Sequence, residues 1–201
     1  MLRIIPKPFF LLFFLCFFAK NALAQNRDIS YMSSGGKLHP LQANMDIRHY
    51  TIILDVDIDK KTIAGFTEID MILSKPSDTI LLDLVYLLKI EKVKANDKPV
   101  NFQHVKDKIY ITSTGPFQAG KQKITIYYGG EPPVAVKPPW FGGFTWTKDR
   151  SGNPWVAINC QKEGGRLYFP CKDHPSDEPN EGVDLFITVP ASLVVAGPGL
   201  L

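Results

Sequence analysis

Residues that could perform catalysis or bind a metal are few and widely spaced in this sequence. Zinc sites place histidine or cysteine ligands at short, regular spacings. The four histidines are instead isolated from one another and from any Cys-x-x-Cys pair; they are His39, His49, His104 and His174. No serine stands in a Gly-x-Ser-x-Gly turn, a common setting of a hydrolase nucleophile. We therefore predict no catalytic residue, no metal ligand and no cofactor site in the chain.

One group of polar residues around His174 needs a separate interpretation. Asp173, Asp177 and Glu178 lie beside this histidine and could form an acid–base or metal cluster with it. Prolines at positions 175 and 179 make the segment a rigid turn, and polar side chains in turns usually bond to their own backbone. We favour the structural interpretation, because the sequence offers no second cluster to complete a site.

The first residues are typical of a secretory signal peptide. Arg3 and Lys7 are followed by an apolar run over residues 9–19 and by Ala22-Leu23-Ala24, a small-x-small cleavage site. We predict a signal peptide over residues 1–24, cleaved after Ala24, and an exported protein that is periplasmic or secreted. The apolar run is shorter than the roughly 20 residues of a spanning helix, so no stable membrane anchor is expected.

The charge balance argues against a nucleic-acid partner. Arg3, Lys7 and Lys20 are three of the 23 basic residues, and all 20 acidic residues follow them, so the mature chain carries equal numbers of each. A nucleic-acid-binding domain would be expected to show a basic stripe of its own.

The mature chain shows the alternation of β-strands. Apolar and polar residues alternate over 50–58 and again over 62–73, and Lys60-Lys61 lies between the two runs, so they predict a hairpin. No convincing helix is found. Further strands are predicted between Gly- and Pro-containing turns at Thr79–Val85, Lys89–Ala95, Lys108–Ser113, Gln122–Tyr128, Trp155–Asn159, Arg166–Phe169 and Val183–Val189.

Many short strands separated by turns predict an all-β fold, an antiparallel β-sandwich. Residues 25–45 are polar and turn-rich and are predicted to be an extended lead-in, and residues 46–201 the domain itself. Prolines predict a long loop over Glu131–Trp146, which also holds four large aromatic rings. These rings could form a binding surface or pack against the sheet; we favour packing.

The stretch Trp155–Pro175, WVAINCQKEGGRLYFPCKDHP, resembles the N-terminal domain of the aminopeptidase N and leukotriene hydrolase family of zinc metallopeptidases. That domain carries a Cys-Gln/Glu element and then a pattern close to Ala-Arg-x-x-Phe-Pro-Cys-x-Asp-x-Pro, with Gly165 replacing its alanine here. The resemblance extends back over Asp46–Leu84 and forward to residues 187–190. The matching motif residues are Arg166, Phe169, Pro170, Cys171, Asp173 and Pro175.

The resemblance implies a saddle-like β-sandwich that serves a zinc-dependent aminopeptidase as an accessory domain. It also implies that Gln161, which follows the motif's first cysteine, reaches into the active-site cleft and binds the substrate. The family's His-Glu-x-x-His and Gly-x-Met-Glu-Asn motifs are absent. We therefore expect the catalytic domain and its zinc to be missing, the sandwich to be incomplete at its C-terminal end, and the chain alone to be inactive.

Two questions stay open at this level. Cys160 and Cys171 could form a disulfide in an oxidising compartment, although related intracellular proteins carry cysteines here in the reduced state. An alternative function is a free-standing secreted β-sandwich that binds a peptide or glycan through the loop Trp140–Trp146. Within the motif, Arg166 could pair with Asp173 across the turn, and the pair would contribute most to stability if it were buried.

Overall fold

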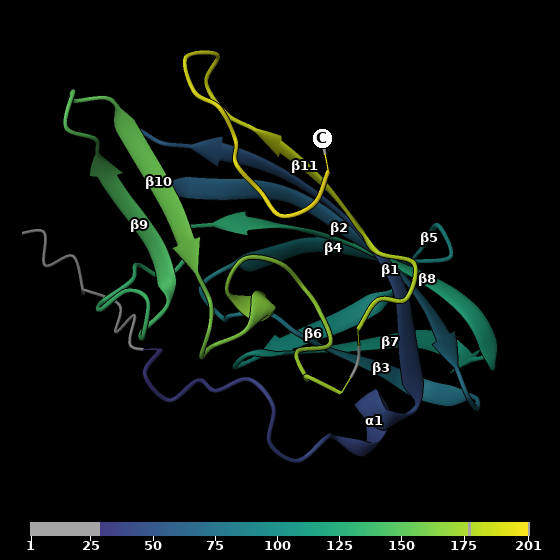
Figure 1. Ribbon diagram of the computed structural model, residues 1–201. Coiled ribbons are helices and arrows are strands. Elements are labelled where there is room, and N and C mark those ends of the chain that lie inside the picture. The colour runs from purple at the N-terminus through teal and green to yellow at the C-terminus, as the bar shows by residue number, and fades with distance from the viewer. Residues whose placement is uncertain (1–28, 177, 201) are drawn as a thin grey trace, which may run out of the picture.

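The structure, a computed structural model, describes residues 29–176 and 178–200 (Figure 1). Strands dominate this part of the chain, and helix is confined to two short turns, α1 (Pro40–Ala43) and η1 (Gly165–Leu167). The strands are β1 (Met45–Asp57), β2 (Thr62–Leu73), β3 (Ser77–Asp83), β4 (Lys89–Ala95), β5 (Lys98–Pro99), β6 (Asn101–Val105), β7 (Lys108–Phe117), β8 (Gly120–Gly130), β9 (Gly143–Lys148), β10 (Pro154–Asn159) and β11 (Val183–Thr188).

The strands form three sheets. The large sheet has the order β11-β1-β2-β8-β4-β5, a second has the order β3-β7-β6, and β9 and β10 form a hairpin of their own. Figure 1 shows the hairpin beside one end of the large sheet and the three-stranded sheet at its other end. All pairings are antiparallel except that of β1 with β11, which is parallel. The predicted all-β, largely antiparallel fold is confirmed.

The hairpin of β1 and β2 follows from the residue alternation. The core-facing side of the sheet carries Ile52 and Leu54 of β1 and, next to them, Ile69 and Met71 of β2. All four side chains are almost completely buried. In the turn between the strands, the Asp57 carboxylate accepts the Lys60 backbone N–H at 2.9 Å. Burying one face of each strand fixes the register, because a slip of one residue would expose every apolar side chain.

The described part of the lead-in, residues 29–45, packs against the domain and contains a short helix. Ile29 and Met32 are buried in the hydrophobic core, and α1 lies just before β1. His39 caps α1 by accepting the Leu41 backbone N–H at 3.2 Å, and Pro40 occupies the first turn, where its missing donor costs nothing. A four-residue helix is too short to produce a periodic apolar pattern, so the sequence did not reveal it.

Two other element predictions are wrong. Residues 166–169 were predicted as a strand, but they begin in the 3-10 turn η1, which follows Gly164 at a φ of 87°. The loop predicted over residues 131–146 ends early, because β9 starts at Gly143 and pairs with β10. The prolines of this segment all precede Gly143, so nothing in the sequence opposes a strand after it.

Candidate functional site

Gln161 lies in a turn directly after β10, and its side chain is exposed. It is therefore not part of a sheet. Within the described residues, no hydrogen bond holds its amide. A neutral amide carbonyl at such a position can accept a hydrogen bond from an ammonium group.

The motif that follows Gln161 folds around one buried ion pair. Arg166 Nε lies 2.7 Å from Asp173 Oδ2, and both side chains are largely buried. The predicted pair is thus present. The Nε hydrogen points at the Glu163 carbonyl, 2.9 Å away, so Arg166 and Asp173 attract each other without sharing a hydrogen bond. A second guanidinium nitrogen, Nη2, donates to the Ser33 carbonyl at 2.6 Å.

Asp173 is held between the lead-in and the core. The Ser34 hydroxyl donates to its Oδ1 at 3.0 Å, and its own backbone N–H donates to the Asp83 carboxylate at 3.1 Å. Burial raises the pKa of the Asp173 carboxyl, and the nearby Arg166 and the Ser34 hydrogen bond only partly offset this effect. The buried pair of Arg166 and Asp173 therefore binds residues 33–34 of the lead-in to the motif.

Asp83, at the end of β3, is a buried charge that the sequence analysis missed. The Gln42 amide donates to its Oδ2 at 2.5 Å, and Lys108 of β7 forms an ion pair with its Oδ1. Its backbone exchanges hydrogen bonds with Cys171, at 2.7 and 3.0 Å. Four segments distant in sequence meet at this carboxylate, so no local pattern could have indicated it.

The remaining motif residues have structural surroundings. The Phe169 ring meets Tyr50 edge to face, with centroids 5.5 Å apart, and Pro170 is buried. Cys160 and Cys171 are both free thiols, and burial raises the pKa of each of them. Pro175 is exposed at the end of the motif.

The glycine at position 165, where the family pattern has alanine, fits its surroundings. A Cβ atom built at Gly165 would lie 2.7 Å from the edge of the Phe169 ring. Such a contact is too close for an alanine unless the ring moves. Glycine in place of the family's alanine therefore leaves room for the Phe169 ring in the position that it has in this chain.

Of the cluster around His174, the histidine itself contacts backbone groups, while Asp177 lies outside the described residues. His174 Nε2 lies 3.1 Å from the Gly36 carbonyl, and Nδ1 lies 2.7 Å from the Ser176 hydroxyl. Over residues 29–176 and 178–200, no three His, Cys, Asp or Glu side chains are placed to hold a metal ion.

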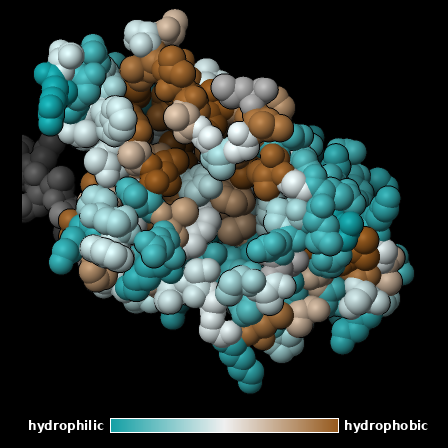
Figure 2. Space-filling model, in the orientation of Figure 1, coloured by the Kyte–Doolittle hydropathy of each residue, from teal (hydrophilic) through white to brown (hydrophobic). Residues whose placement is uncertain are grey.

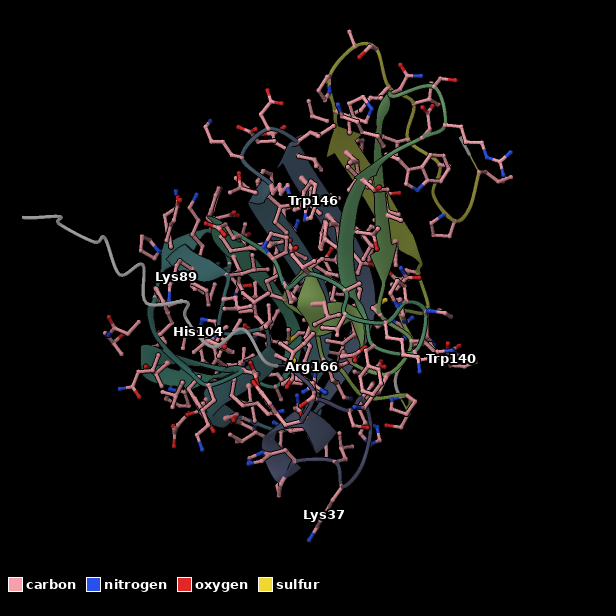
Figure 3. The ribbon with its side chains drawn as sticks, turned by 90° about the vertical axis from the view of Figure 1, so that its left-hand side faces the viewer. Lys37, Lys89, His104, Trp140, Trp146 and Arg166 are labelled. Carbon is pink, nitrogen blue, oxygen red and sulfur yellow. The ribbon has the colours of Figure 1, made fainter. Side chains whose placement is uncertain are left out.

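The aromatic loop splits into two parts. Phe144 and Trp146 stack on each other, with centroids 5.3 Å apart, and Phe144 is buried in the core, as the packing interpretation expected. Trp140 and Phe141 instead stay exposed, by 61% and 39%. Figure 3 shows Trp140 at the periphery of the molecule. Only this pair is open to a binding partner.

Comparison with known proteins gives the same family as the motif. The sequence profile of the peptidase M1 N-terminal domain matches residues 47–193. Among solved structures, a two-domain M1 zinc metallopeptidase with bound L-arginine is 25% identical, with a TM-score of 0.60 over 78% of this chain. Yeast leukotriene A4 hydrolase bound to bestatin is 20% identical, with a TM-score of 0.55 over 67% of the chain, and shows the same fold.

The matched part is one portion of these larger proteins. The chain spans 35% of the two-domain metallopeptidase and 22% of the yeast hydrolase. The profile match extends over most of the chain and includes both the β1–β2 hairpin and the motif around Arg166. This protein belongs to the peptidase M1 N-terminal domain family.

Proposed function

We propose that this chain is the N-terminal accessory domain of an exported zinc aminopeptidase, which removes N-terminal residues from peptides. The observation that carries the proposal is the exposed Gln161 side chain, placed directly before the family motif. In this proposal Gln161 accepts a hydrogen bond from the substrate's α-ammonium, while the zinc and its ligands belong to the catalytic domain. The chain alone would not hydrolyse peptides.

Export rests on residues 1–24, which lie outside the described part of the chain. In the described part, no helix has the length and apolar character needed to cross a membrane. We propose that the signal peptide is cleaved after Ala24 and that the mature protein acts in the periplasm or outside the cell. Mass spectrometry of the mature protein would show Gln25 as its first residue.

The full-length enzyme allows a direct test of Gln161. A hydrogen bond to a charged group contributes about 1.5–3 kcal/mol, so Gln161→Ala should lower kcat/KM for aminoacyl-anilides by roughly ten- to a hundredfold. Zinc-dependent release of the first residue, lost with a chelator, is expected of the unaltered enzyme.

Gln103, exposed on β6, offers a matched control, and Gln103→Ala should leave kcat/KM unchanged. Equal kcat/KM for the Gln161→Ala and unaltered enzymes on several substrates would contradict the assigned role. A full-length protein without any zinc-dependent turnover would contradict the proposed activity itself. The alternative, peptide or glycan binding by a free-standing domain, now depends on Trp140 and Phe141 alone.

A further inference from the structure

The exposed pair Trp140 and Phe141, here called the aromatic tip, lies across from Gln161. The last pair of the β9–β10 ladder is Gly143 with Asn159. Phe141 precedes the first residue of β9 by two positions and Gln161 follows the last residue of β10 by two positions, so the hairpin places both at the same end. Lys162, next to Gln161, places its Nζ 4.9 Å from the Phe141 ring centroid, which confirms that the two segments meet.

Glu163 holds the tip in this place. Its side chain is 0% exposed, and its Oε2 accepts the Gly142 backbone N–H at 3.0 Å. The fit around Gly142 is close: an added Cβ would lie 2.3 Å from the Asn159 carbonyl oxygen and 2.5 Å from Glu163 Oε2. The Phe141 N–H is bonded as well, to the Lys137 carbonyl at 2.9 Å. The tip is therefore fixed on the turn that carries Gln161.

This arrangement is poorly explained by stability alone. Glu163 Oε1 is buried and, within the described part of the chain, has no hydrogen-bond partner. A buried polar atom without a partner costs free energy, and a buried carboxylate oxygen costs more than a neutral group. Trp140 and Phe141 meanwhile remain 61% and 39% exposed. A rigid, exposed aromatic pair is what a binding surface needs, because little freedom is lost when a ligand packs on it.

We propose that the aromatic tip and Gln161 form one substrate-binding surface, in which Gln161 holds the peptide's ammonium and the tip packs against a large apolar side chain of the same peptide. The inference rests on the proposed function and adds a substrate class, peptides that carry such a side chain at their N-terminal end. Glu163 is a positioning residue, because it acts on the substrate only through the Gly142 backbone.

The test compares anilides of leucine, phenylalanine and alanine with the full-length enzyme. One apolar contact in a pocket changes discrimination by roughly ten- to two-hundredfold. Phe141→Ala and Trp140→Ala should therefore lower kcat/KM for the leucine and phenylalanine substrates about tenfold or more, and for the alanine substrate by less than about threefold. Trp155→Ala is the matched control, since Trp155 is 58% exposed but lies at the far end of β10, and it should change none of these values.

Variants at Glu163 separate positioning from folding. Glu163→Gln retains an acceptor for the Gly142 N–H and should keep the substrate preference, whereas Glu163→Ala should lose it as Phe141→Ala does. Melting temperatures of all variants identify any that fail to fold; for those, Trp140→Ala, at an exposed position, remains informative.

Equal loss on all three substrates would overturn the proposal and make the tip a contact between domains. Unchanged kinetics of Phe141→Ala and Trp140→Ala would overturn it too, while leaving the zinc aminopeptidase activity and the role of Gln161 standing. An unaltered enzyme without zinc-dependent turnover would overturn both the proposed function and this inference.

Discussion

At the scale of single residues, the most consequential group outside the proposed site is the buried guanidinium of Arg166. It pairs with Asp173 and donates to two backbone carbonyls, those of Ser33 and Glu163. Removing one partner of a buried ion pair is costly because the other charge stays behind in a region of low dielectric constant. The pair thus makes the lead-in part of the domain.

We predict that Arg166→Met, which keeps the apolar stem, lowers the free energy of unfolding by about 3–5 kcal/mol. Urea unfolding followed by tryptophan fluorescence measures this change. The control is Lys60→Met, whose partner Asp57 is solvent-exposed, and no measurable change is expected there. Similar unfolding curves for both variants would mean that the Arg166 pair adds nothing to stability.

At the scale of elements, the two backbones of the β1–β2 pair approach each other closely at Gly65. A Cβ atom at Gly65 would lie 1.9 Å from the Ile53 carbonyl oxygen, which belongs to the neighbouring strand. Only a shift of the two backbones could admit it. This glycine therefore marks a close approach of the two strands near the turn of the hairpin.

Gly65→Ala should lower the free energy of unfolding by about 1–3 kcal/mol or more, because overpacking forces backbone shifts. Gly115→Ala on β7 provides the comparison, since a Cβ there meets nothing within 4 Å. It should leave stability nearly unchanged. Thermal unfolding by circular dichroism measures both, and equal melting temperatures would contradict the packing argument.

The sequence predicts an element well when a pattern within that segment determines it, and poorly when contacts with distant residues do. The bounds of β2 and β4 agree with the predicted ones, whereas β1 begins at Met45, before the alternation that starts at Tyr50. The strand β6 was not predicted because its outward residues include the apolar Val105 and its inward ones include the polar His104, so no apolar alternation appears. The motif was found through family resemblance, but Asp83 and Glu163 were not, because their partners lie far away in the sequence.

At the scale of the whole molecule, apolar residues gather on one part of the surface. Figure 2 shows them between the β9–β10 hairpin and β11, whereas the opposite end of this face is mostly hydrophilic. Strand β11 is the edge of the large sheet in the described chain, and Phe186 on it is largely exposed. An apolar edge strand offers unpaired backbone groups to another chain.

We therefore predict that the isolated chain associates through β11 at high concentration and that Phe186→Lys reduces this association, since a charge on an edge strand opposes pairing. Light scattering across a concentration series is the measurement. Val194→Lys, at an exposed position outside any strand, should have little effect. A monomer at every concentration tested would contradict the prediction.

The parallel pairing of β1 with β11 has a consequence for the time course of folding. Arg48, at the start of the domain, bonds to Glu181, 133 positions later in the sequence, and β1 gains its outer neighbour only from β11. A nascent chain leaves the ribosome from its N-terminus, so β1 is synthesised well before β11. The large sheet can be completed only after β11 has been synthesised. Contacts between such distant residues slow folding to the millisecond or second range. Until β11 is in place the outer edge of β1 is unpaired, and unpaired strand edges make folding intermediates prone to aggregation.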